Sequence, residues 1–219
     1  MIIDEIMLNQ HGGRLHAGYT ISGVSMENSY HRGVGQSDFT LLKQDAGLKS
    51  INITVTFLGS AREEIDRLKS LFEMRLMGKN DLVLDGNYYS VICQEIGNAN
   101  YKGFGACEVE YQFLGYKHGP LQTITGNHFY CASTLPHTDC RITVTASKDA
   151  STYKVGTVTF FDVSSGDVLV VDGLDKRILV NEAPAAQKAD WLRFPSLVPG
   201  ENVIICDDTV TVEYYPVYF

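Results

Sequence analysis

The sequence predicts a mainly β protein, in which an N-terminal α+β domain of strands and one helix precedes a C-terminal all-β sandwich. Three patterns lead to this prediction. Residues 50–57 alternate between apolar and polar side chains, residues 61–77 repeat apolar side chains at helical spacing, and no helical pattern follows residue 121. The chain also has 20 Gly, 12 Tyr and 10 Phe among 219 residues, a composition that favours strands and turns.

The alternating segment predicts a strand with one buried face, because successive side chains of a strand point to opposite sides. Its apolar members are Ile51, Ile53, Val55 and Phe57.

A helix is predicted over residues 61–77. Ser60 and Glu63 have the spacing of a capping box, and Gly78 can end the helix because glycine adopts the left-handed conformation without a Cβ clash. The apolar side chains that would share one helix face are Ile65, Leu68, Phe72 and Leu76.

Beyond the helix, Asp85 and Gly86 separate two apolar runs in residues 82–96, which is the short-range signature of a β-hairpin. A further strand is expected over residues 105–114. The unpatterned tract 115–120 ends in a proline and marks the expected boundary. The predicted domains are therefore residues 1–117 and 118–219.

The second half predicts short strands at roughly 8–12-residue spacing with turn residues between them, as in a β-sandwich. The candidate strands are residues 143–146, 157–161, 168–171, 177–180, 203–206 and 209–215.

Composition excludes several functions. The net charge of −8 and the absence of a Lys/Arg run argue against nucleic-acid binding. The N-terminal MIIDEIMLN lacks the basic region of a signal peptide, and no apolar run reaches the ~18 residues of a membrane span. We therefore expect synthesis in a cytoplasm, no membrane partner, and reduced thiols in the five cysteines.

No pattern predicts an enzyme or a cofactor, since the chain has no GxSxG element and no phosphate-binding glycine motif. A metal-like cluster of His128, Cys131, His137 and Cys140 matches no standard zinc spacing, and a surface loop joining the domains is the favoured interpretation. Four aspartates that suggest calcium are better explained by turn formation: Asp162, Asp167, Asp172 and Asp175.

Aromatic side chains in the second half offer a possible sugar or partner contact. Trp191 with Phe194 could stack on a sugar, although core packing is the favoured interpretation for a lone tryptophan beside leucines. Tyr215 has two interpretations as well, packing within a strand or contact with a partner, and packing is favoured.

Residues 30–47 form a long, glycine-rich segment that we expect to be a loop. Loops of this length inside a compact domain tend to be functional. We expect this one to reach a neighbouring subunit through Gly33, Val34, Gly35, Gln36, Ser37 and Asp38.

These pieces together resemble the distal tail (Dit) proteins of long-tailed bacteriophages. The glycine-rich segment, KSINITVTFLG at 49–59, the helix and the 82–96 hairpin resemble the Dit belt domain. The passage from GDVLVVDG at 166–173 to PSLVPGEN at 195–202 resembles its galectin-like or carbohydrate-module-like sandwich.

The resemblance implies a structural component of the virion tail tip without catalytic residues. It implies a homo-hexameric hub ring that joins the tail tube protein to the tail-associated lysin or fibre hub and anchors receptor-binding proteins. Two alternatives stay open: a carbohydrate-binding module that recognises host surface sugars, which would need exposed aromatics along a groove, and a related ring-forming tail tube protein, which would turn an acidic face to the DNA channel.

Overall fold

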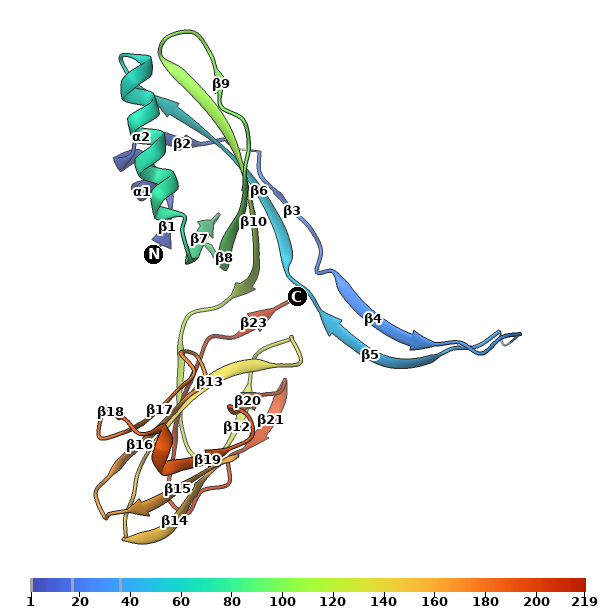
Figure 1. Cartoon of the computed structure of the whole chain (residues 1–219), viewed down its shortest axis with the longest axis vertical. Coiled ribbons are helices and arrows are strands. Elements are labelled where there is room, and N and C mark those ends of the chain that lie inside the picture. The colour runs from blue at the N-terminus through green and yellow to red at the C-terminus, as the bar shows by residue number, and fades with distance from the viewer. Residues whose placement is uncertain (1, 17, 36) are drawn as a thin grey trace. The chain divides into compact units, whose positions relative to one another are not determined.

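The computed structural model describes residues 2–16, 18–35 and 37–219. The chain divides into two compact units, Met1–Lys117 together with Phe219, and His118–Tyr218. Strands dominate both units (Figure 1), so the predicted mainly β class is confirmed. No helix within the described residues is both long and apolar enough to span a membrane.

The first unit combines strands with helices. Its elements are β1 (Ile2–Ile3), α1 (Glu5–Gln10), β2 (Gly13–Leu15), β3 (Thr20–Ile21), β4 (Met26–His31), β5 (Thr40–Ala46), β6 (Lys49–Leu58), α2 (Arg62–Arg75), β7 (Lys79–Leu84), β8 (Asn87–Ile96), β9 (Asn100–Tyr101) and β10 (Ala106–His118).

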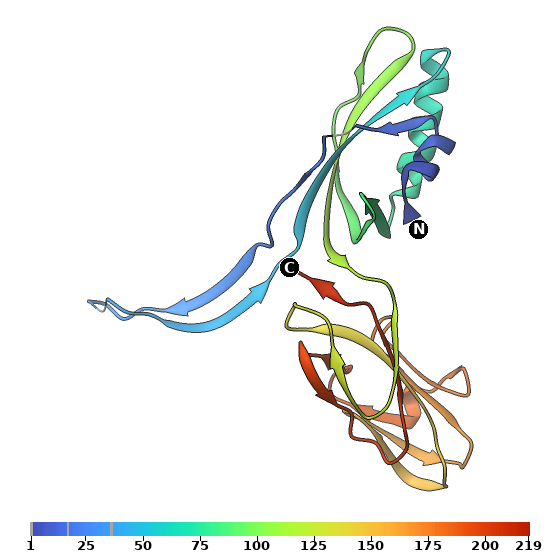
Figure 2. The ribbon, with the colours of Figure 1, turned by 180° about the vertical axis from the view of Figure 1, so that it is seen from behind.

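The main sheet of this unit has the order β1-β7-β8-β10-β6-β2, with β3 paired to β6 and β9 to β10. The predicted strand over residues 50–57 is confirmed as β6, which pairs antiparallel with β10 from Leu58↔Ala106 to Lys49↔Gly115. Helices α1 and α2 cover one face of the sheet, as both views show (Figure 2).

An aromatic cluster lies between α2 and the sheet. The ring of Phe72 packs against Phe57 of β6 and Tyr111 of β10 at centroid distances of 5.7 and 5.3 Å, and all three side chains are fully buried. The predicted helix is thus confirmed, with its apolar face on the core.

The start of α2 differs from the prediction. The helix begins at Arg62 after Ala61, so its third residue is Glu64 rather than Glu63. The Glu64 carboxylate accepts hydrogen bonds from the Ser60 backbone N–H at 2.8 Å and from its hydroxyl at 2.6 Å. The predicted Ser60/Glu63 capping box is wrong by one residue.

The predicted hairpin over residues 82–96 is confirmed as β7 and β8. Its turn residues Asp85 and Gly86 have φ of 47° and 75°. Positive φ at both central positions is what a two-residue turn needs to match the twist of its strands, and Asp-Gly supplies it at low cost.

The second unit contains strands and a short 3-10 turn. Its elements are β11 (Gln122–Thr125), β12 (His128–Cys131), β13 (Thr138–Thr145), β14 (Ala150–Val155), β15 (Val158–Val163), β16 (Val168–Asp172), β17 (Arg177–Val180), β18 (Ala183–Pro184), η1 (Ala186–Lys188), β19 (Ala189–Trp191), β20 (Ser196–Leu197), β21 (Gly200–Val203), β22 (Thr211–Tyr214) and β23 (Val217–Tyr218).

Two layers of strands share one core in this unit. One sheet has the order β11-β22-β13-β16-β17-β18, and the strands β14-β15-β19 and the pair β12-β21 form smaller sheets. Side chains from both layers, such as Ile142 and Val212 from one and Val155 and Phe160 from another, belong to the same buried cluster. The predicted sandwich arrangement follows from this alternation of inward and outward side chains.

One predicted strand of this unit is wrong. Residues 203–206 were expected to form a strand, but β21 ends at Val203. The apolar side chains of this segment do not share one environment, because Ile204 is buried whereas Val203 and Ile205 are exposed to solvent. The other five predicted strands overlap observed ones: β13, β15, β16, β17 and β22.

Asp208 ties the segment before β22 to the core. Its carboxylate accepts hydrogen bonds from the Tyr153 hydroxyl at 2.5 Å and from the Ser147 N–H at 2.9 Å. These bonds, that from Tyr153 first, lower the pKa of Asp208 below its ordinary 3.8. The charged form is therefore favoured in the folded state.

Replacing Asp208 with Asn should lower the melting temperature at neutral pH. A carboxyl whose pKa is depressed by folding stabilises the protein above its unfolded pKa, and this contribution is lost as the pH falls through the folded value. The difference in melting temperature between wild type and variant should therefore shrink as the pH falls below 3.8. Asp207→Asn is the control, since Asp207 forms an exposed ion pair with Lys148, a kind of contact that contributes little to stability. A pH-independent difference would contradict this assignment.

Candidate functional site

Strands β4 and β5 form a two-stranded hairpin, the arm (residues 26–46), which extends away from the rest of the first unit (Figures 1 and 2). The expectation of a loop over residues 30–47 is therefore wrong for half of this segment, residues 30–31 and 40–46. The hairpin ladder has an irregularity between Ser29 and Tyr30, where Leu42 on the opposite strand has no pairing partner. This bulge breaks the alternation by which a sequence reveals a strand.

The arm has two chemically different faces. Cross-strand pairing places Glu27 opposite Asp45, Ser29 opposite Lys43 and His31 opposite Thr40 on one side. On this polar face, Lys43 forms an ion pair with Asp45.

The other side is the apolar face, which consists of Met26, Tyr30, Phe39 and Leu41. These side chains are 45–63% exposed, and the rings of Tyr30 and Phe39 meet edge to face at 5.7 Å. Part of this side is hollowed into a groove of about 480 Å³, which Tyr30, Phe39 and Leu41 line together with four polar residues, Asn28, Arg32, Ser37 and Gln44. It is thus a concave, mostly apolar surface with a few polar groups.

The tip of the arm holds the residues expected to make subunit contacts. Gly33, Val34, Gly35, Ser37 and Asp38 connect the two strands, whereas Gln36 lies outside the described residues. Val34 is fully exposed, and Gly35 has φ of 79°, a conformation that favours glycine.

An isolated two-stranded hairpin is marginally stable in water. Throughout the described part of the arm, the side chains of both strands are exposed or at most half-buried. A surface that covers the apolar face would stabilise the hairpin, so the arrangement favours binding rather than chemistry.

Three of the four candidate metal residues lie in strands, so the expectation that they belong to a surface loop joining the domains is wrong for these three. His128 and Cys131 belong to β12 and Cys140 to β13, while His137 lies between these strands. Cys131 and Cys140 are buried in the apolar core, and burial raises the pKa of the Cys140 thiol to about 12. Among the described residues, no three His, Cys, Asp or Glu side chains converge in a way that could hold a metal ion.

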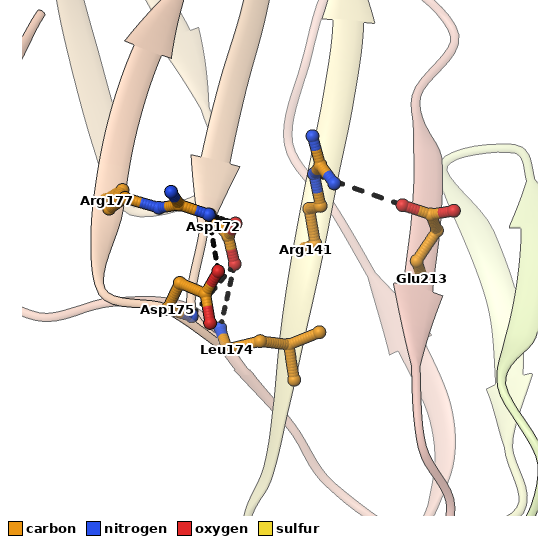
Figure 3. A network of polar contacts seen from close by, with 6 residues as sticks. All are labelled: Arg141, Asp172, Leu174, Asp175, Arg177 and Glu213. Atoms are coloured by element: carbon orange, nitrogen blue, oxygen red, sulfur yellow. Dashed lines mark hydrogen bonds and ion pairs between the residues drawn. The ribbon is translucent and has the colours of Figure 1, made fainter. Parts of the chain in front are cut away.

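Of the four aspartates predicted to form turns, Asp167, Asp172 and Asp175 lie at turns, two of them shown in Figure 3, whereas Asp162 lies within β15 (Val158–Val163) and that part of the prediction is wrong. The buried carboxylate of Asp172 accepts hydrogen bonds from the N–H groups of Leu174 and Asp175 at 3.1 and 3.0 Å, and Arg177 binds both aspartates. Asp167 likewise accepts from the Ser164 N–H at 2.9 Å. On the same sheet face, Arg141 of β13 faces Glu213 of β22 at 4.0 Å.

The aromatic candidates differ in exposure. Trp191 ends β19, is half-buried, and packs on the core with Phe194 at a ring distance of 6.1 Å. Phe194 in turn lies beneath the Lys176 ammonium. Tyr215 is exposed and meets the His118 ring edge to face. Trp191 and Tyr215 thus have different ring neighbours, Phe194 and His118.

Comparison with known proteins adds a family. Residues 134–218 match the family described as "Siphovirus-type tail component, C-terminal domain" (SPP1_Dit). This part of the chain belongs to the Dit family. The resemblance predicted from the sequence is thereby confirmed for this part of the chain.

Solved structures share the fold of the Dit domain and of the first unit. The crystal structure of SPP1 Dit (gp 19.1), described as a paradigm of the hub adsorption apparatus in phages that infect Gram-positive bacteria, has a TM-score of 0.67 at 13% identity, over 91% of this chain and 92% of that one. A chain of the phage p2 baseplate, in its activated conformation with Ca, has a TM-score of 0.54 at 10% identity, over 95% and 92%. The corresponding structure with Sr gives 0.55 at 10% identity, over 95% and 91%. No curated protein sequence matches the chain.

Proposed function

We propose that the chain forms a homo-hexameric hub ring at the tip of a phage tail. The ring would join the tail tube to the tail-tip or baseplate proteins and anchor receptor-binding or tail-associated lysin proteins. The observation that carries this proposal is the arm, whose apolar face is uncovered in the single chain. The likeness of fold to SPP1 Dit and to a p2 baseplate chain supports a place in the hub.

The physical argument concerns the kind of contact that an arm makes. A projecting hairpin that binds a different surface of its neighbour gives a heterologous contact, which generates a closed ring when the rotation between subunits closes. The role is structural and not enzymatic, and the ring would assemble in the host cytoplasm before it enters the virion.

The first test is the solution mass of the purified chain by light scattering over a range of concentrations. Six copies of 24.3 kDa give a mass of about 146 kDa for a closed ring. A mass that rises toward this value with concentration supports the ring, because weak assemblies dissociate on dilution. A constant monomer mass at the highest concentration would contradict it.

Shortening the tip should weaken assembly without unfolding the chain. In this variant residues 33–38 are replaced by an Asn-Gly turn, which suits a two-residue hairpin connection. We expect the far-UV spectrum and melting temperature to be retained while the mass at a given concentration falls. The matched control replaces the Asp85–Gly86 turn with Asn-Gly, which alters a hairpin outside the arm. An unchanged oligomer in the tip variant would show that the tip makes no subunit contact.

A further inference from the structure

The face of the main sheet that the helices leave uncovered carries a row of apolar side chains on β8. Tyr88, Ile92 and Ile96 alternate with polar neighbours and are 42–46% exposed. The intervening Tyr89 and Val91 point to the opposite side and belong to the buried core. We call Tyr88, Ile92 and Ile96 the β8 strip.

Most of the other side chains on this sheet face are polar, with Leu58 at the end of β6, Leu114 of β10 and Val83 of β7 as the apolar members. Between Asn52 and Thr56 the outward side chains of β6 are polar, and β10 contributes acids and an amide: Asn52, Thr54, Thr56, Glu108, Glu110 and Gln112. The β8 strip is therefore an exposed apolar row on a mostly hydrophilic surface, and such rows commonly mark interaction sites.

The β8 strip matches the apolar face of the arm in spacing. Met26 and Tyr30 lie four residues apart on β4, as do the successive members of the strip on β8. Four residues of a strand span about 13 Å, so the two surfaces have the same repeat. In each, a polar side chain lies midway, Asn28 on the arm and Gln94 on β8. Matched repeats allow two β surfaces to interdigitate face to face.

Charge favours the β8 strip over the other exposed apolar row of this unit. Arg32 supplies the charge in the groove of the arm. The end of the strip lies beside Glu110, whose carbonyl accepts a hydrogen bond from the Gly97 N–H at 2.8 Å. Lys79, opposite Ile92, is a cation beside the strip and donates to the Tyr116 hydroxyl, while two acids of β10, Glu108 and Glu110, lie on the same sheet face.

The competing row comprises Leu71 and Met74 on the outer side of α2 and Met77 just after the helix ends. Arg67 and Arg75 accompany it on the exposed helix surface. A cation on the arm would meet like charges there, which disfavours this pairing.

We propose that the apolar face of the arm packs on the β8 strip of a second copy of this chain. Both surfaces are exposed within one chain, so the contact joins two copies. It uses different surfaces on the two partners, as a ring requires. This inference rests on the proposed ring and specifies its contact.

The test is site-specific cross-linking in the assembled full-length protein. Tyr30 is replaced with the photoreactive residue p-benzoylphenylalanine in isotopically heavy protein, which is mixed with light wild-type protein and irradiated. We expect heavy–light cross-links into the peptide that contains residues 87–96. The same probe at Ser29, on the polar face of the arm, should give at least about tenfold fewer of them, because strand neighbours point to opposite sides.

Substitutions provide a second measurement. Ile92→Asp should raise the concentration needed for assembly at least about tenfold, whereas Met74→Asp on α2 should leave it unchanged. Melting temperatures of both variants show whether each is folded. If rings form but Tyr30 cross-links into α2 or another surface, the inference is overturned while the ring stands. If the protein stays monomeric at every concentration, the inference and the proposed ring are both wrong.

Discussion

Replacing Phe72 with alanine should lower the free energy of unfolding of the first unit by about 3–5 kcal/mol, the usual cost of removing a fully buried phenylalanine. Phe72 is completely buried and touches an aromatic ring on each of two adjacent strands, Phe57 and Tyr111. The cavity left by its ring cannot close without moving α2 or the sheet. Urea or guanidinium unfolding, followed by a signal from this unit, measures the effect.

Met74→Ala is the matched control for Phe72→Ala. Met74 lies on the same helix, two residues away, and its side chain is exposed. Its replacement should change the free energy of unfolding by no more than about 0.5 kcal/mol. Equal losses from the two variants would show that the helix is not anchored through Phe72.

Converting the apolar face of the arm to a charged one should abolish assembly. Tyr30 and Leu41 are cross-strand partners on this face, so Tyr30→Asp with Leu41→Asp places two carboxylates side by side on it. Burying them against a neighbour carries a desolvation penalty in addition to their mutual repulsion, and we expect at least about a 100-fold loss of affinity. Light scattering should report a monomer at concentrations where the wild type is assembled.

The control for this pair lies one residue away on each strand. His31 and Thr40 are also cross-strand partners, but on the polar face. His31→Asp with Thr40→Asp introduces the same two carboxylates at the same distance from the tip, and assembly should persist. Loss of assembly in both double variants would mean that the arm responds to its net charge rather than to the chemistry of one face.

The elements that the sequence predicted well are those whose burial follows a simple period. Residues 50–57 bury every second side chain, so their alternation identifies β6 directly, and Ile65, Leu68 and Phe72 recur at helical spacing on the core side of α2. The Asp85–Gly86 turn is equally local, since it depends on the conformational freedom of two residues. These features need no information about distant parts of the chain.

The arm could not be predicted in the same way. Neither face of its strands is buried within the chain, so their apolar side chains do not recur at every second position. The bulge at Leu42 also shifts the alternation of side chains between the two faces. The expectation that the tip residues contact a neighbouring subunit depends only on the length and glycine content of the segment. The pairing that separates a polar from an apolar face depends on the register, which the sequence does not reveal by itself.

The direct continuation of the arm into β6 has a mechanical consequence. β5 ends at Ala46 and β6 begins at Lys49, and β6 is then held to β10 by a ladder from Lys49 to Leu58. Hydrogen bonds in such a ladder lie perpendicular to the strands, so a force along the strand loads them together instead of one after another. Tension applied to the arm would be borne in shear by the whole length of β6, the geometry in which a sheet resists rupture best.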